Sequence, residues 1–234
     1  MIVQYDVIII GAGAAGMMSA IEAGKRGRKV LLVDHYKKIG EKIRISGGGR
    51  CNFTNIHTNP NKFISQNPKF VRSALSQYTQ NDFTNLINKY EIKFHEKKLG
   101  QLFCDHSAQQ IVEMLLKECE LAKVTILKEF IIKDVSKDYD QYLVSTETDK
   151  YSSESLIIAT GGLSVPKIGA TSLGYEIAKK FEHNIVETLP ALVPLTFSEK
   201  ILEMCKELTG LSVEAIVSFN KVLFQEGMYL LTEV

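Results

Sequence analysis

The chain has 234 residues, of which 45% are hydrophobic and 24% charged, a composition that excludes a disordered or collagen-like protein. Its 28 Lys and Arg against 27 Asp and Glu give a net charge of +1, so we expect no nucleic acid and no membrane partner. The four cysteines lack CxxC or metal-site spacing, and no apolar run reaches the roughly 20 residues of a membrane span. We therefore expect a reduced, cytoplasmic protein with no metal site.

The charge is unevenly distributed along the chain. Residues 1–58 hold 9 Lys and Arg and 4 Asp and Glu, a local +5, whereas the remaining 19 against 23 give −4. A basic opening segment fits an anionic small ligand, and a solvated basic face is the alternative.

The first 34 residues predict a strand–loop–helix–strand unit. Tyr5–Ile10 is a β-branched run typical of a strand buried in a parallel sheet, and a glycine loop follows it. Helical spacing of small and apolar residues covers Met17–Arg26, and a second buried strand, Lys29–Val33, ends at Asp34. This order predicts a Rossmann-like α/β domain with a parallel sheet.

The glycine loop has the GxGxxG spacing of a dinucleotide site. Gly11 permits the tight turn, Gly13 lets the backbone approach a pyrophosphate, and Gly16 lets the helix pack closely on the strand. The helix N-terminus favours phosphate, and Asp34 can accept hydrogen bonds from a ribose. A glycine turn without a dinucleotide and an NAD-dependent dehydrogenase remain alternatives.

A second glycine-rich stretch covers residues 40–55. Three consecutive glycines, Gly47–Gly49, leave bare backbone against which a ligand can lie, and Lys42, Arg44 and Arg50 place cations beside it. A flexible glycine loop is the simpler alternative.

The remaining pattern predicts further helices and strands, and a boundary near two prolines in Leu189–Leu195. Ser107–Gln110 has the spacing of a capping box that opens a helix. We expect a domain over 1–189, with a β-meander, and a β-rich domain over 190–234. The predicted helices are Lys69–Tyr78, Asp82–Tyr90 and Gly174–Phe181, and the predicted strands are Val124–Leu127, Phe130–Val135, Gln141–Glu147, Ser155–Ala159, Leu211–Phe219 and Lys221–Phe224, the last two joined by a turn at Asn220–Lys221.

The stretch GEKIRISGGGRCNFTN resembles the signature of a bacterial family of FAD-dependent oxidoreductases that includes bile-acid dehydro-reductases and aminoacetone-oxidase-like flavoproteins. The likeness continues in Ala159–Ser164, Gly169–Thr171 and Pro190–Leu195. It implies an FAD enzyme that exchanges hydride or electrons between a small organic substrate and NAD(P)H or oxygen. Neither the residues nor the resemblance indicates the catalytic acid or base or the oligomeric state.

The resemblance also implies which residues bind FAD. The glycine loop would bind the pyrophosphate, Asp34 the adenosine ribose, and the second glycine stretch the flavin. The residues expected to bind the cofactor are Gly11, Gly13, Ala14, Ala15, Gly16, Asp34, His35, Lys42, Gly47, Gly48, Gly49, Arg50, Cys51, Asn52, Ile132, Thr160 and Gly161. Cys51 is more simply a packing residue, and His35 could equally lie on an exposed loop.

The chain departs from the family in length. Family members complete the second domain and return to the first with a strand and a helix. We therefore expect an incomplete FAD domain followed by a truncated second domain. A non-catalytic remnant, or one half of a split flavoprotein, is the alternative to an active enzyme.

Overall fold

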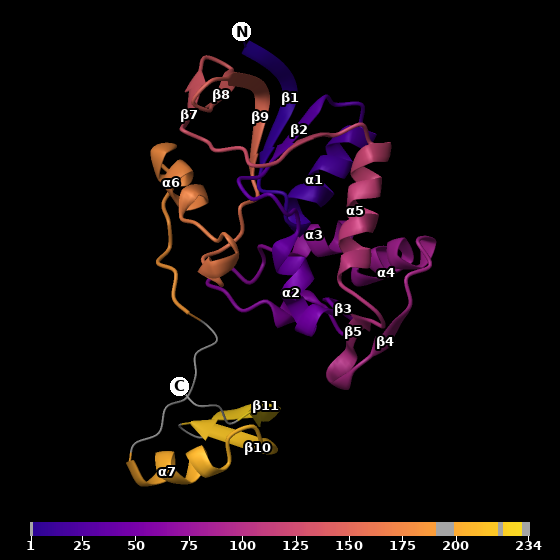
Figure 1. Cartoon of the computed structure of the whole chain (residues 1–234), viewed down its shortest axis with the longest axis vertical. Coiled ribbons are helices and arrows are strands. Elements are labelled where there is room, and N and C mark those ends of the chain that lie inside the picture. The colour runs from indigo at the N-terminus through magenta and orange to yellow at the C-terminus, as the bar shows by residue number, and fades with distance from the viewer. Residues whose placement is uncertain (1, 191–198, 220–221, 231–234) are drawn as a thin grey trace. The chain divides into compact units, whose positions relative to one another are not determined.

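The computed structural model describes residues 2–190, 199–219 and 222–230. The chain divides into two compact units, Met1–Ile185 and Val186–Val234 (Figure 1). The predicted turn at Asn220–Lys221 and most of the proline-containing stretch at Leu189–Leu195 lie outside the described residues.

A six-stranded sheet forms the centre of the first unit, in the order β6-β2-β1-β9-β8-β7. β1 pairs in parallel with both β2 and β9, β2 pairs in parallel with β6, and β7, β8 and β9 form an antiparallel meander. The Rossmann-like α/β fold with a meander is therefore confirmed. The strands are β1 (Ile2–Ile10), β2 (Val30–Val33), β6 (Thr125–Leu127), β7 (Asp134–Asp138), β8 (Gln141–Ser145) and β9 (Lys150–Ile158).

Alternating side chains of β1 supply both faces of the sheet with apolar surface. Ile9 belongs to a cluster that includes buried residues of α1 (Ala14–Lys25) and α5 (Gln109–Leu121), two helices that lie side by side (Figure 1). Ile8 points the other way, into a cluster with Val135 and Val144 of the meander. Strands buried on both faces explain the continuous β-branched run in the sequence.

A smaller antiparallel sheet, in the order β3-β5-β4, follows the second glycine stretch. Its strands are β3 (Asn52–Asn55), β4 (Phe94–Glu96) and β5 (Gln101–Cys104). The other helical elements of the first unit are α2 (Glu41–Gly49), η1 (Pro60–Lys62), α3 (Arg72–Gln77), α4 (Gln80–Lys89), η2 (Lys98–Gly100), η3 (Pro166–Ile168) and α6 (Leu173–Lys180).

Two local predictions are wrong. The predicted strand Phe130–Val135 begins only at Asp134, because Phe130 donates its backbone N–H to Asp34 at the end of β2 and buries its ring against Tyr151. The predicted capping box at Ser107–Gln110 does not form. It would require Ser107 as the N-cap, but α5 starts one residue later and its N-cap is Ala108. The box occurs instead at α4, where Thr79 and Asp82 exchange side-chain and backbone hydrogen bonds.

The second unit contains α7 (Glu199–Glu207) and an antiparallel pair, β10 (Ser212–Phe219) and β11 (Val222–Leu230). Within the described residues of the whole chain, we find no helix that is long and apolar enough to cross a membrane.

A buried carboxylate joins α1, α4 and α5. Glu118 is only 2% exposed, and its Oε1 accepts hydrogen bonds from Lys89 Nζ at 2.6 Å and from the Tyr90 hydroxyl at 2.7 Å. Lys25 Nζ lies 3.1 Å from its Oε2. Burial alone would raise the pKa of Glu118, but these three donors outweigh it and hold the pKa at about 2.

We expect the Glu118→Gln variant to lose stability in a pH-dependent way. A carboxyl whose pKa falls on folding stabilises the protein at any pH above the pKa that the group has in the unfolded state. This contribution is lost as the pH falls from about 4.5 toward 2. Because both lysines are half exposed, we expect a loss of only about 2 kcal/mol at pH 7. Urea unfolding of both proteins at pH 7 and pH 3 should show the difference shrinking by roughly half. A difference that does not change with pH would contradict the assignment.

Candidate functional site

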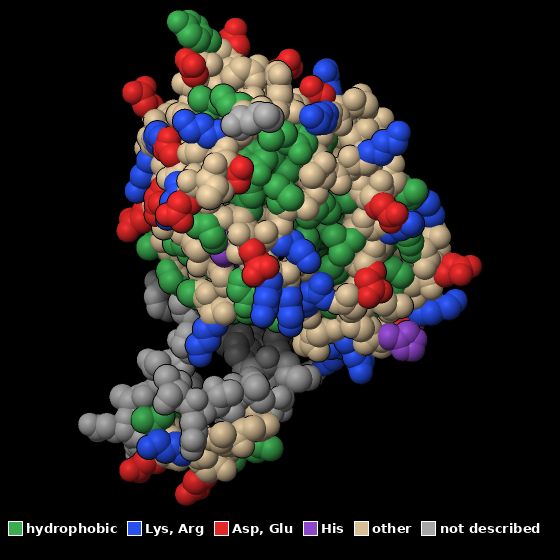
Figure 2. Space-filling view, turned by 45° about the horizontal axis from the view of Figure 1, so that its top comes forward, with side chains coloured by type: hydrophobic (Ala, Val, Ile, Leu, Met, Phe, Trp, Pro, Cys, Tyr) green, Lys and Arg blue, Asp and Glu red, His purple; other side chains and the backbone are tan. Residues whose placement is uncertain are grey.

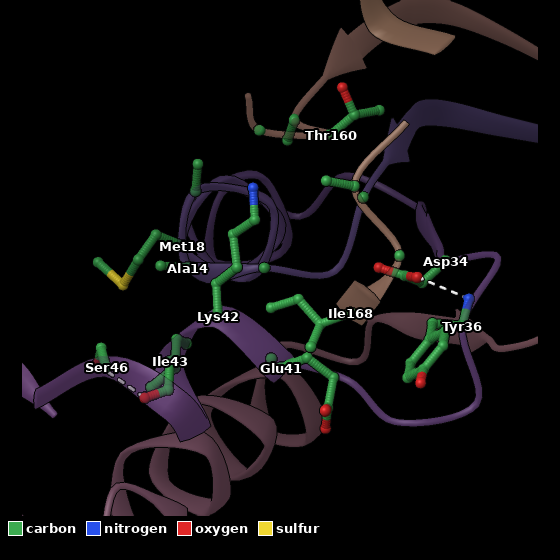
Figure 3. A pocket seen from close by; sticks show the side chains of 18 of the residues that line it. Ala14, Met18, Asp34, Tyr36, Glu41, Lys42, Ile43, Ser46, Thr160 and Ile168 are labelled. Atoms are coloured by element: carbon green, nitrogen blue, oxygen red, sulfur yellow. Dashed lines mark hydrogen bonds between the residues drawn. The ribbon is translucent and has the colours of Figure 1, made fainter. Parts of the chain in front are cut away.

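A cavity of about 850 Å³ lies where the parallel strands end. It is lined by the loop after β1, by Asp34 after β2, by Thr160 and Gly161 after β9, and by α2 (Figure 3). Ligands of open α/β sheets bind at this edge, and the volume is in the range of small-molecule and cofactor sites.

Two glycines of the loop are required by close packing of the backbone. A Cβ at Gly16 would lie 1.8 Å from the Gly11 carbonyl oxygen, so that only glycine lets α1 begin this close to β1. Gly11 has a φ of +104°, and its Cβ would lie 2.5 Å from the Ala159 carbonyl oxygen beyond β9. Both glycines therefore shape the loop.

Gly13 has a different environment. It lines the cavity, its φ of −84° suits any residue, and a Cβ there would meet no atom within 4 Å. It is the N-cap of α1, which has no side-chain cap and no acidic residue in its first turn. The first N–H groups of α1 and their partial positive charge therefore remain available to an anionic ligand.

Asp34 is held at the other side of the loop. Its Oδ2 accepts a hydrogen bond from Ala12 N at 2.7 Å and its Oδ1 one from Tyr36 N at 2.8 Å (Figure 3). The side chain is 15% exposed and lines the cavity. Because a carboxylate offers about four acceptor positions, it can still accept hydrogen bonds from a diol.

Lys42 crosses the cavity from α2 toward the end of β9 (Figure 3). Its Nζ donates to the Gly162 carbonyl oxygen at 2.7 Å and to Ser164 Oγ at 3.3 Å. A Cβ at Gly161 would lie 3.6 Å from the same Nζ. The ammonium group therefore stands next to bare backbone, where it can meet an anion.

Part of the cavity wall is apolar and is here called the apolar end. Met18, Phe53 and Phe83 line it, and the rings of Phe53 and Phe83 lie 6.0 Å apart between centroids. Cys51 lines the same end and is buried, which raises the pKa of its thiol, although a hydrogen bond with Ser46 partly opposes this shift. A protonated, buried thiol is consistent with a packing role.

The cavity brings together most of the residues that the sequence singles out, and they come from four separate segments. Those that line it are Gly11, Gly13, Ala14, Ala15, Asp34, His35, Lys42, Cys51, Asn52, Thr160 and Gly161.

The other predicted residues lie outside this cavity. Gly47 packs against Phe103, where a Cβ would come within 2.6 Å of the ring, and Gly48 and Gly49 continue the left-handed turn that ends α2. Ile132 lines a second cavity of about 300 Å³ that shares Gly11 and Asp34 with the first. The remaining two are Gly16, whose place in the loop is described above, and Arg50, whose carbonyl oxygen accepts from Cys104 N.

Several lining residues were not anticipated. Glu41 follows the left-handed Gly40 and has one buried carboxylate oxygen without a hydrogen-bond partner among the described residues. Gly169 turns at a φ of +90° beside His35. Both belong to stretches quoted for the family resemblance, which was the signal that could have found them. Phe83, in a helix 30 residues from Phe53, gave no such signal.

The structure-described part of the chain contains no group of three or more His, Cys, Asp or Glu side chains placed to hold a metal ion.

The comparison with protein families matches the HI0933-like protein Rossmann domain over residues 5–234. The chain therefore belongs to the HI0933-like family and contains the Rossmann domain of that family. The resemblance drawn from the glycine stretches is confirmed at this level. It is not confirmed for the bile-acid reductases in particular, because the relatives with higher identity have another name.

Two of these relatives are named ribosomal RNA dihydrouridine synthase. The Escherichia coli protein is 48% identical over 226 residues, which cover 96% of this chain and 56% of the relative. The Haemophilus influenzae protein is 42% identical and covers 94% and 58%. A 3-dehydro-bile acid delta(4,6)-reductase of Clostridium scindens is 26% identical and covers 80% and 46%. The chain thus spans a little over half the length of the first two relatives.

These names correct one expectation. The net charge of +1 led us to exclude nucleic acid, and the family resemblance implied a small organic substrate, but two relatives with high identity are named for a reaction on ribosomal RNA. Net charge is a sum over the surface, and it does not exclude a local basic face.

Substitutions of Gly13 and Gly16 by alanine should have very different effects on stability. We expect Gly16→Ala to cost more than about 3 kcal/mol, because its Cβ would collide with backbone that cannot move independently. Gly13→Ala should change the free energy of unfolding by less than about 0.5 kcal/mol, since its Cβ enters open space. Urea denaturation measures both, and equal losses would show that Gly13 also supports the fold.

Proposed function

We propose that this chain binds FAD and acts in the reduction of uridine to dihydrouridine in ribosomal RNA. The proposed substrate is supported by the 48% identity, over 96% of the chain, with a protein named for that reaction. The cofactor is supported by the site itself.

The cavity residues suit an extended dinucleotide in three ways. Gly13 and the N-terminus of α1 offer a cradle for the pyrophosphate, which a Cβ would partly fill. Asp34 can accept from the adenosine ribose, and Lys42 adds a cation. The end with Phe53 and Phe83 offers apolar surface to the flavin ring.

The reaction saturates the C5=C6 bond of uracil, which takes up a hydride and a proton. Reduced FAD would supply the hydride and would be oxidised in doing so, and we propose NAD(P)H as the reductant that restores it. The residues of this chain bind and orient the cofactor, and the apolar wall of Met18, Phe53 and Phe83 keeps water from that end. A ribosomal RNA substrate would place the reaction in the cytoplasm.

Valine at position 13 should remove the cofactor without unfolding the protein. We expect purified wild-type chain, mixed with FAD and desalted, to keep a flavin absorption band, and Gly13→Val to keep less than about a tenth of it, because the branched side chain would occupy the cradle. Ala74→Val, on the exposed side of α3, is the matched control and should keep the full band. The melting temperatures of the three proteins should agree when they are measured without FAD, because bound FAD would itself stabilise the proteins that hold it. A Gly13→Val protein that retains stoichiometric flavin would overturn the proposed binding mode, and a wild type that binds none would overturn the cofactor.

The reaction can be tested in cells. We expect the chain, expressed in E. coli that lacks its ribosomal RNA dihydrouridine synthase, to restore dihydrouridine in ribosomal RNA, measured by mass spectrometry of its nucleosides. The Gly13→Val variant, expressed at the same level, should restore none, because it holds no FAD. A chain that binds FAD but yields no dihydrouridine would refute the substrate and leave the cofactor standing.

A further inference from the structure

The chain contains a long stretch without acidic residues. Positions 42–81 hold six Lys and Arg and no Asp or Glu. On the face drawn in Figure 2, acidic and basic side chains are interspersed over most of the larger unit. A stretch of this kind forms a local positive field within a protein of net charge +1.

The middle of this stretch, residues 56–79, is here called the connecting segment, because it joins β3 to α4. Residues 61–70 are all exposed, and they include Phe70 at 79% and Ile64 at 100%. Three cations of the segment, Lys62, Lys69 and Arg72, form no ion pair and no side-chain hydrogen bond with any described residue. They are therefore free to meet phosphate groups.

The connecting segment has a defined shape, although it is mostly not helical. Asn59 Oδ1 accepts from Asn61 N at 3.1 Å, and Asn67 Oδ1 accepts from Lys69 N at 3.3 Å, so each asparagine organises a turn. Its first residue, Ile56, donates to the Gly100 carbonyl oxygen at 2.9 Å and accepts from Gln80 Nε2 at 3.3 Å. The two ends of the segment are thereby held together.

The residues just outside both ends of the connecting segment line the cavity. Phe53, just before it, and Phe83, just after it, line the apolar end and contact each other. The residues that flank the segment on both sides therefore belong to the end of the cavity proposed for the flavin.

We propose that the connecting segment binds single-stranded RNA, with Lys62, Lys69 and Arg72 contacting phosphates and Phe70 stacking on a base. This inference rests on the proposed RNA substrate. Unpaired cations, exposed aromatic rings and interleaved Asn, Gln and Ser are the groups that bind single strands. A membrane surface fits less well, because membrane-binding segments are amphipathic helices, and residues 63–71 form no helix.

Fluorescence anisotropy with a labelled 12-nucleotide single-stranded RNA tests this surface. The test variant carries Lys62→Gln, Lys69→Gln and Arg72→Gln. The control variant carries Lys128→Gln, Lys150→Gln and Lys179→Gln, three exposed lysines of the same unit that also form no ion pair with described residues. Each variant loses three positive charges. All proteins are assayed with FAD present, across a range of KCl concentrations.

We expect the test variant to raise the Kd at least tenfold and to lower the slope of log Kd against log salt by about 2, the value for three lost phosphate contacts on a single strand. The control should stay within twofold of wild type. Phe70→Leu should raise the Kd about tenfold without changing the salt slope, and Phe70→Tyr should retain binding.

Other outcomes would overturn the proposal in distinct ways. Equal losses in both triple variants would mean non-specific attraction, and unchanged binding in the test variant would place RNA elsewhere while the RNA substrate stands. A wild type that binds FAD but no RNA would overturn both the surface and the RNA substrate. Binding to vesicles of phosphatidylserine and phosphatidylcholine, without RNA binding, would assign the segment to a membrane.

Discussion

The contact between Gly16 and the Gly11 carbonyl is the constraint on which the rest of the first unit depends. With no side chain at either position, α1 begins directly against the end of β1, and Gly11 in turn lies against Ala159 at the end of β9. The three elements therefore meet through their backbones. The cavity begins at that point, and its floor is bare peptide, with unpaired N–H groups facing outward from the start of α1. Asp34 closes the arrangement, because the backbone N–H of Ala12 within the loop donates to its carboxylate.

The parts of this architecture that follow from local pattern could be predicted from the sequence. A buried strand shows as a β-branched run, and close backbone approach shows as glycine, so the unit from Tyr5 to Asp34 and the meander were within reach. Features that depend on distant partners were not. Glu118 appears in the sequence as one more charged helical residue, and only folding brings Lys25 and Lys89 to it. Phe130 has strand propensity, but the backbone oxygen of Asp34 and the ring of Tyr151 decide its conformation.

The site shows the same division. Residues in glycine motifs were found because the motif exists for backbone reasons that a single sequence displays. The apolar end of the cavity depends on Phe53 and Phe83, which approach each other because the connecting segment returns to Gln80 beside Ile56. No spacing rule links two phenylalanines 30 positions apart, so the apolar end of the cavity could not be predicted from the sequence. The triple glycine shows the reverse case. Its left-handed conformation ends α2 and makes room for Phe103. In the sequence, glycines with this structural role look the same as glycines that contact a ligand.

Cations of the first unit lie both at the cavity and on the connecting segment. The local excess in residues 1–58 was interpreted as the footprint of a small anionic ligand, and two of its cations, Lys38 and Lys42, do line the cavity. Of the six cations in positions 42–81, however, only Lys42 lines it. The other five are not placed to neutralise a pyrophosphate there, and three of them stand unpaired on the connecting segment. A dinucleotide carries two phosphate charges and needs few cations, whereas a nucleic acid carries one for every nucleotide. The acid-free stretch therefore holds more cations than the cofactor requires, and the connecting segment, which carries three of them unpaired, is flanked in the sequence by two rings of the cavity wall, Phe53 and Phe83.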